Sequence, residues 1–265
     1  MTNFQVWVDA TWTELFAAPN RERMNKQGYE ERTAQLGERI DEIIDRSGIQ
    51  GWDESGRESK LSIPIDIIDF SLKANGIDAD TISNDRQLEE QLRRVYTGKR
   101  ILDLGSRHGG LYHPLLKFLG GEVIGIEREK EMVDLGTRKG ANIVQTDVRE
   151  LAGISRTFPI IFANELYCQK YLQEKTFDGP EFSQAIERIE RGGFFLATGT
   201  DLYLNRTIFE KFYTGRKRGL QIEHRWRRYT TADLERKQRD AGATIDTLFS
   251  AFIPQQAFFV KKEKN

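Results

Sequence analysis

The sequence predicts an α/β protein with a doubly wound, mostly parallel, seven-stranded sheet that ends in an antiparallel strand pair and follows a helical N-terminal cap. Three observations support this prediction. Short apolar runs alternate with helical patterns from Lys99 onwards, glycines cluster after the first run, and the last two runs are too close for a crossover helix. A chain of 265 residues can form one such domain with an elaboration, or two small domains.

The first 98 residues show helical patterns and no strand–glycine–helix signature. Helix formers fill 20–46, and two shorter helices are expected over 62–76 and 84–96. Between the first and the second of these helices, the polar and glycine-containing segment 51–60 is predicted to be an exposed loop. We expect the helices to pack beside the sheet or to cover its ligand-binding edge.

The most informative stretch runs from Lys99 to Gly110 and reads K-R-I-L-D-L-G-S-R-H-G-G. A short apolar run leads into a glycine-rich turn, and apolar residues at helical spacing follow over 111–119. The pattern predicts a strand, a tight turn and a helix. Such a turn leaves backbone N–H groups free for an anionic or hydroxyl-rich ligand, although similar turns also occur without a ligand.

Each of the first three predicted strands brings an acid to the same region. Asp103 lies in the first strand, the run 122–127 ends at Glu127, and the run 141–147 ends at Asp147, with a helix over 130–139 between the last two. Ligands of parallel sheets bind at the carboxyl ends of the strands, so these acids are expected to line one crevice. The alternative is that each acid only caps a neighbouring helix.

The alternation continues for two more strands. The apolar run 158–163 predicts a fourth strand, which is followed by N-E-L-Y-C. An amphipathic helix is expected over 180–190 and a fifth buried strand over 194–198.

The alternation of strands and helices stops at 203–229, where aromatic residues are interleaved with cations. We expect this segment to be a substrate-facing insertion. A capped helix follows over 230–242, and strands over 244–252 and 256–262 are predicted to form the antiparallel pair at the edge of the sheet.

Composition excludes several classes. No apolar run approaches the ~20 residues of a membrane span, and the start lacks a signal-peptide pattern, so we expect a cytoplasmic protein with no membrane partner. A single cysteine and three histidines argue against a disulfide or a zinc site, and no metal is expected.

Residues 1–98 carry 12 basic and 19 acidic residues, a net charge of −7, whereas 99–265 carry 28 and 22, a net charge of +6. This break predicts a domain boundary near Gly98.

The series I-L-D-L-G-S-R-H-G-G, V-I-G-I-E-R, I-V-Q-T-D-V and I-I-F-A-N-E, with the closing strand pair, resembles the class I S-adenosylmethionine-dependent methyltransferases. The resemblance covers roughly 99–262 and implies a Rossmann-like fold with S-adenosyl-L-methionine as the cofactor. One position departs from the family pattern D-x-G-x-G-x-G, because Arg107 replaces a glycine. An arginine there either crowds the turn or offers a cation to the cofactor carboxylate.

The resemblance also implies roles for individual residues. Asp103 and the turn from Gly105 to Gly109 would hold the methionine part of the cofactor, and Glu127 would accept hydrogen bonds from both ribose hydroxyls. Asp147 and the backbone of Val148 would bind the adenine amino group, and Asn164 would lie beside the sulfur. The implied cofactor set is Asp103, Gly105, Ser106, Arg107, Gly109, Glu127, Arg128, Asp147, Val148 and Asn164.

Two other classes stay open. A nicotinamide-dependent enzyme would also use Glu127 for ribose, but the phosphate-binding G-x-G-x-x-G is absent and Asp147 would have no task. A non-catalytic module that binds S-adenosylmethionine is the second, and Arg107 is its one hint.

Methyl transfer depends mainly on alignment of the reactants, and a general base is needed only when the acceptor must lose a proton. The candidates are Glu165, Tyr167 and His108, with Glu165 first because it follows the fourth strand. A packing role is favoured for His113, which lies within the helix after the turn.

The acceptor is predicted to be a small or medium-sized molecule, including an anionic one, methylated on nitrogen or oxygen. Tyr203, Arg206 and Tyr229 are the candidate acceptor-binding residues. The basic segment 206–228 also suits RNA or another nucleic acid, and its simplest interpretation is a solvated basic face. The sequence names neither the acceptor nor an oligomeric state.

Overall fold

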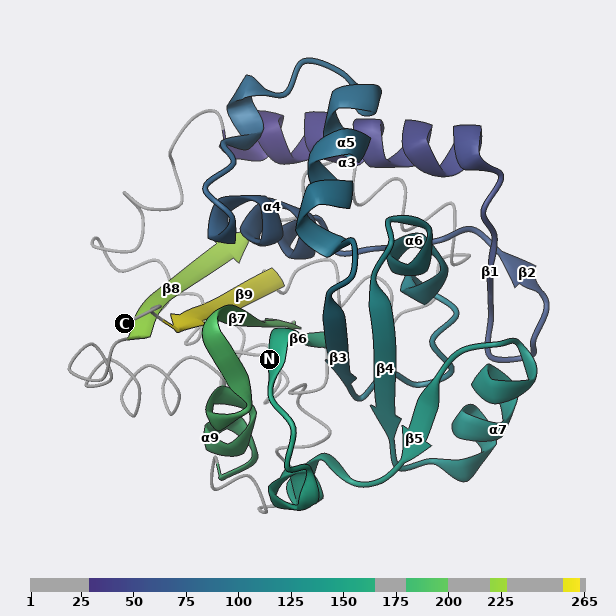
Figure 1. Ribbon diagram of the computed structural model, residues 1–265. Helices are drawn as coiled ribbons and strands as arrows, with labels where there is room; N and C mark the ends of the chain where they lie inside the picture. The colour runs from purple at the N-terminus through teal and green to yellow at the C-terminus, as the bar shows by residue number, and fades with distance from the viewer. Residues whose placement is uncertain (1–28, 165–179, 200–219, 228–254, 263–265) are drawn as a thin grey trace, which may run out of the picture.

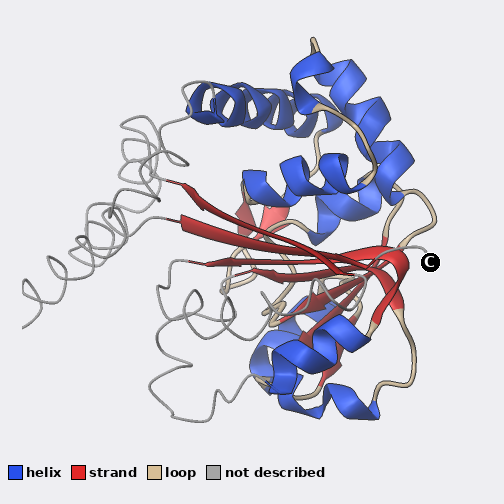
Figure 2. Ribbon diagram, turned by 90° about the vertical axis from the view of Figure 1, so that its left-hand side faces the viewer, coloured by secondary structure: helices blue, strands red, loops and turns tan. Residues whose placement is uncertain are grey.

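A computed structural model describes residues 29–164, 180–199, 220–227 and 255–262 of this chain, and it shows a central sheet with helices on both faces (Figures 1 and 2). The seven strands are ordered β5–β4–β3–β6–β7–β9–β8 across the sheet. Their bounds are β3 Arg100–Leu104, β4 Glu122–Glu127, β5 Ile143–Gln145, β6 Phe158–Asn164, β7 Ile189–Gly199, β8 Leu220–Arg227 and β9 Gln255–Lys262.

The five strands from β3 to β7 are parallel, and β9 runs antiparallel to both of its neighbours, β7 and β8. This confirms the predicted α/β class with a mostly parallel sheet and an antiparallel C-terminal pair. The helices are α3 Tyr29–Ser47, α4 Ile65–Ala74, α5 Asp85–Tyr96, α6 His113–Phe118, α7 Lys130–Arg138 and α9 Pro180–Glu187, with 3-10 turns η1 Ala79–Thr81 and η2 Val148–Gly153.

One strand assignment was wrong. The partner of β9 at the edge of the sheet is β8, within 220–227, and not the predicted run 244–252, which lies outside the described residues. In the sequence L-Q-I-E-H-R-W-R of β8, Leu220, Ile222 and Trp226 fall on alternate positions with His224 among them. The cations around them obscure this period of two. Part of the expected insertion over 203–229 therefore belongs to the sheet.

The segment 51–60 also differs from its prediction as a plain loop. It forms a hairpin of β1 (Gly51–Trp52) and β2 (Glu58–Ser59). The Asp53 carboxylate closes the turn, because its Oδ1 accepts hydrogen bonds from the backbone N–H groups of Ser55 at 2.9 Å and Arg57 at 3.0 Å. The hydrogen bond from the Ser55 hydroxyl is the main reason why the pKa of Asp53 falls to about 2.

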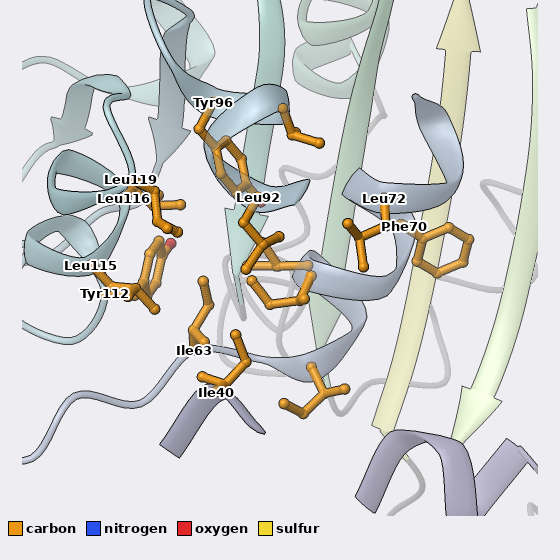
Figure 3. Close-up of a cluster of buried hydrophobic side chains, with 14 of the residues drawn as sticks. Ile40, Ile63, Phe70, Leu72, Leu92, Tyr96, Tyr112, Leu115, Leu116 and Leu119 are labelled. Carbon is orange, nitrogen blue, oxygen red and sulfur yellow. The ribbon is translucent and has the colours of Figure 1, made fainter. Parts of the chain in front are cut away.

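The N-terminal helices share one hydrophobic core with the sheet. A single cluster joins buried side chains of α3, α4 and α5 to side chains of the sheet and of α6. Figure 3 labels members of this cluster from the helices and the segments beside them. Helix α4 is buried almost all round, and on α5 the hydroxyl of Tyr96 donates to Ser71 at 2.9 Å. The helices therefore pack beside the sheet, which is one of the two placements that the sequence predicted.

Asn84 caps α5 by accepting a hydrogen bond from the backbone N–H of Gln87 at 2.9 Å, and the Gln87 side chain accepts one from the backbone of Ser83 at 2.8 Å. We expect Asn84→Ala to lower the free energy of unfolding by about 1 kcal/mol, because a backbone donor at the helix start loses its acceptor. Urea denaturation measures the change. Asn84→Ser keeps an acceptor and is expected to retain most of the stability, so an equal loss in both variants would argue against the cap.

Candidate functional site

Strand register brings three of the predicted site residues, Gly105, Glu127 and Asn164, to one row at the carboxyl edge of the sheet. Leu104 pairs with Ile126 and Asp103 with Phe162. Continued by one residue past Leu104, this register puts Gly105 level with Glu127 on one side and Asn164 on the other. Asn164 in turn pairs with Thr198, whose hydroxyl donates to the Asn164 side-chain oxygen at 2.6 Å.

Glu127 is held rigidly at the end of β4. Its Oε1 accepts hydrogen bonds from the backbone N–H groups of Arg128 at 2.8 Å and Glu129 at 2.9 Å, and its Oε2 accepts one from the N–H of Arg107 at 3.0 Å. The residue is 8% exposed. A carboxylate has about four acceptor positions, so one on Oε2 is left for a ligand after these three bonds.

The turn after β3 needs its unusual backbone. Gly105 and Gly109 both have positive φ, at 68° and 69°. Ser106 ties the turn to β4 through a bond from its N–H to the carbonyl of Ile126 at 3.0 Å. A Cβ at Gly125 would lie 2.3 Å from the Ser106 hydroxyl oxygen, so only glycine allows the turn to approach β4 this closely.

Asp103 lies beneath this turn and is 1% exposed. Its Oδ1 accepts the hydroxyl hydrogen of Tyr112 at 2.7 Å, and its Oδ2 lies 2.7 Å from Nε2 of His113. Burial, followed by the charge of Asp103, raises the pKa of Tyr112 well above its usual value, so this phenol remains a donor. Asp103 therefore anchors Tyr112 and His113, the two residues that begin α6 after the turn. His113 is buried, as the packing role expected for it requires.

Two buried polar atoms have no hydrogen-bond partner within the described ranges, namely Oγ of Ser106 in the turn and Nδ1 of His113 at the start of α6. Both side chains approach Gly125, where a Cβ would lie 3.2 Å from Cε1 of His113. Buried polar atoms without partners are costly, so a water molecule or a polar ligand atom is expected to satisfy them.

Asp147 caps η2 and also pairs with Arg149. Its Oδ1 accepts from the backbone N–H of Arg149 at 2.9 Å, and its Oδ2 lies 2.5 Å from a guanidinium nitrogen of the same residue. The Arg149 hydrogen bond is the main cause of the lowered pKa of Asp147. The capping interpretation thus holds for this acid, whereas Val148 beside it is buried. A ligand that binds Asp147 would share its carboxylate oxygens with Arg149.

His108 is buried inside the turn, and its Nδ1 accepts a hydrogen bond from the N–H of Gly110 at 3.0 Å. In the neutral ring the proton must then sit on Nε2, so neither nitrogen is free to accept a proton while this bond exists. Burial, with a contribution from the charge of Arg107, lowers the pKa of His108. This geometry favours a role in holding the turn over the predicted role as a general base.

A pH dependence follows from this bond. Burial and the charges of Arg107 and His113 oppose protonation of His108. The charges of Glu54 and Asp53 favour protonation, but each does so less strongly than burial and Arg107 oppose it. Because the folded-state pKa lies below the unfolded value of about 6.5, stability is complete above that pH and declines as the pH falls towards the folded-state pKa.

Denaturation curves between pH 5 and pH 8, taken on wild type and His108→Asn, measure this effect. The asparagine side chain of this variant would keep an acceptor for the Gly110 N–H and has no proton to gain. We therefore expect the variant to lack the His108 part of the decline. Superimposable pH profiles of the two proteins would contradict the assignment.

The β1–β2 hairpin docks on the turn beside α7 (Figure 1). The N–H of Trp52 donates to the carbonyl of Gly110 at 3.4 Å, and a Cβ at Gly110 would lie 2.2 Å from the carbonyl oxygen of Trp52. At the tip of the hairpin, Glu54 pairs with the Arg107 guanidinium at 2.5 Å. Sequence reasoning missed this neighbour of the turn.

The remaining predicted site residues lie outside the described residues, so their roles stay predictions: Glu165, Tyr167, Tyr203, Arg206 and Tyr229. In the described part of the chain, no three histidine, cysteine, aspartate or glutamate side chains are grouped to hold a metal ion. Nor does any helix among these residues combine the length and apolar character needed to cross a membrane.

The strand order defines the fold class. Parallel strands extend to both sides of β3, and β9 is inserted antiparallel between β7 and β8. This is the Rossmann-like arrangement of the class I methyltransferase fold, which the sequence resemblance implied.

No protein-family model and no curated protein matches the sequence. Among solved structures, the chain is similar to phosphoethanolamine N-methyltransferase 2 of Haemonchus contortus in complex with S-adenosyl-L-methionine, with 18% identity, a TM-score of 0.45 and 63% of this chain covered. The match spans 49% of that enzyme. A putative RNA methyltransferase from Pyrococcus horikoshii gives 16% identity and a TM-score of 0.44, with 89% of this chain and 99% of that chain covered. A putative sarcosine dimethylglycine methyltransferase from Galdieria sulphuraria gives 12% identity and a TM-score of 0.43, with 72% and 91% covered.

Proposed function

We propose that this protein is an S-adenosylmethionine-dependent methyltransferase that transfers a methyl group to a nitrogen or oxygen of a small or medium-sized acceptor. The observation that carries the proposal is the Glu127 carboxylate, which three backbone N–H groups fix at the carboxyl edge of the sheet, one of them from Arg107 in the Gly105–Gly109 turn. An oriented carboxylate beside a glycine turn suits the two hydroxyls of a ribose. One hydroxyl would take the remaining position on Oε2, and the other would share Oε1 with the N–H groups of Arg128 and Glu129.

The residues present fit this cofactor. The turn can lie close to β4 because position 125 is a glycine, and the Ser106 hydroxyl and Nδ1 of His113 still need partners. In this proposal Glu127 binds the ribose, Asp147 and the backbone of Val148 bind the adenine, and the Gly105–Gly109 turn holds the methionine part. Asp103 contributes by fixing the turn through Tyr112 and His113.

The cofactor supplies a methyl group that the positive charge on its sulfur already activates. The protein then has to orient the acceptor and exclude water, which makes positioning the main source of acceleration. Asn164, held by Thr198 at the same edge, is proposed to lie beside the sulfur. Glu165 and Tyr167, directly after β6, remain the proposed general bases for acceptors that must lose a proton.

The acceptor is proposed to bind over the carboxyl ends of β6 and β7, with Tyr203, Arg206 and Tyr229 as its contacts. RNA is the competing acceptor, on the strength of the basic residues within 206–228. A cytoplasmic location completes the proposal, together with a helical cap over 1–98 that shares its core with a methyltransferase domain over 99–265.

Titration calorimetry and labelled-methyl transfer test the function. We expect S-adenosylhomocysteine to bind and NADH not to bind, because the turn lacks the phosphate-binding glycine pattern. Incubation with S-adenosylmethionine labelled in its methyl group and fractionated cell extract then identifies the acceptor class. Label in a ribonuclease-sensitive fraction would assign RNA, and binding without any labelled product would assign a non-catalytic module.

A further inference from the structure

Arg107 holds a backbone conformation that arginine rarely adopts. Its φ of 51° lies in the left-handed region, and no other residue in the described segments except glycine has a positive φ. Glycine adopts this conformation freely, whereas a side chain with a Cβ makes it costly. An arginine at this point of the turn therefore indicates a task for its guanidinium group.

The guanidinium is charged, accessible and weakly held. It pairs with Glu54 at 2.5 Å, and the two side chains are 55% and 56% exposed. Water screens an ion pair of this kind, and such pairs contribute little to stability. Arg107 can therefore exchange Glu54 for another carboxylate at small cost.

The root of this side chain lies beside the proposed ribose site. The backbone N–H of Arg107 donates to Oε2 of Glu127, so the guanidinium starts from the turn that is proposed to hold the amino-acid end of the cofactor. That end carries a carboxylate. Arginine binds carboxylates through two parallel hydrogen bonds. Asp103 is buried and engaged by Tyr112 and His113, so it does not occupy the guanidinium.

We infer that Arg107 exchanges Glu54 for the carboxylate of the cofactor's amino-acid end, and so selects ligands that carry this carboxylate. The inference rests on the proposed function and deepens it by naming a specificity-determining residue. Glu54, on the β1–β2 hairpin, holds the guanidinium when no ligand is bound.

A pair of ligands separates this role from a structural one. S-adenosylhomocysteine carries the carboxylate, whereas 5′-methylthioadenosine keeps the nucleoside and lacks the amino-acid end. By calorimetry, we expect Arg107→Gly to weaken S-adenosylhomocysteine about tenfold and to leave 5′-methylthioadenosine within about twofold of wild type. Glycine suits the φ of this position, so the variant is expected to fold, and Arg107→Lys should give an intermediate affinity for S-adenosylhomocysteine.

Arg57→Ala is the matched control. Arg57 belongs to the same hairpin, is 80% exposed and pairs with Asp53, so its removal should change neither affinity. Glu54→Gln should bind S-adenosylhomocysteine at least as tightly as wild type, because the guanidinium is released. The inference would be overturned if Glu54→Gln lost as much affinity for S-adenosylhomocysteine as Arg107→Gly. It would also be overturned if Arg107→Gly lost affinity for both ligands equally, or lost none for S-adenosylhomocysteine. Failure of the wild type to bind either ligand would instead overturn the proposed function.

Discussion

Replacement of Glu127 by glutamine is expected to weaken S-adenosylhomocysteine binding by about 100-fold or more. Hydrogen bonds to a charged group contribute about 1.5–3 kcal/mol each, and the proposed site gives Glu127 two hydroxyl partners. The amide also loses backbone partners, since both carboxylate oxygens accept from backbone N–H groups and the amide nitrogen can only donate. Calorimetry on the purified variant measures the loss.

Glu129→Gln is the control for this experiment. Glu129 is exposed, carries the same charge two residues away, and keeps the backbone N–H that donates to Glu127. We expect its affinity for S-adenosylhomocysteine to match that of wild type. Wild-type affinity in Glu127→Gln would mean that the carboxylate does not contact the ligand.

Removal of the Asp103 carboxylate is expected to cause a large loss of stability. In Asp103→Ala, the buried hydroxyl of Tyr112 and the ring of His113 both lose their partner. Each buried polar group left unsatisfied costs about 1–3 kcal/mol, and more for a charged one, so we expect the free energy of unfolding to fall by about 3–5 kcal/mol. Chemical denaturation at pH 7 measures this change.

The comparison is with Asp134→Ala. Asp134 pairs with Lys130 one helical turn away at 2.5 Å, but the two side chains are 46% and 68% exposed. Its removal should alter stability by less than about 0.5 kcal/mol. If Asp103→Ala lost no more than Asp134→Ala, the buried cluster would not be what supports the turn. Asp103→Asn, which keeps one acceptor, serves if the alanine variant does not fold.

The sequence was most informative where local pattern and fold agree. The first three strands of the sheet and the glycine turn between β3 and α6 have a clear period and clear punctuation, and the structure contains them close to their predicted bounds. Glu127 was placed at its strand end for the same reason. The register that puts it level with Gly105 and Asn164 follows from strand pairing, which periodicity alone does not specify.

The features that sequence reasoning missed depend on contacts between distant segments. The hairpin over 51–59 contains only four strand residues, and its docking against Gly110 becomes visible only when the chain is folded. Its local signals were the turn residues Asp53 and Gly56, which fit an exposed loop equally well. Likewise, the engagement of Asp103 by Tyr112 and His113 needs the helix to return beneath the turn, and the position of Arg107 in the left-handed region needs backbone coordinates.

The most direct test of the proposed function is a crystal structure of the protein with S-adenosylhomocysteine. We predict that both ribose hydroxyls lie within hydrogen-bond distance of the Glu127 carboxylate and that the adenine lies against Val148 beside Asp147. An adenosine bound elsewhere, with Glu127 still occupied only by the N–H groups of Arg107, Arg128 and Glu129, would contradict it.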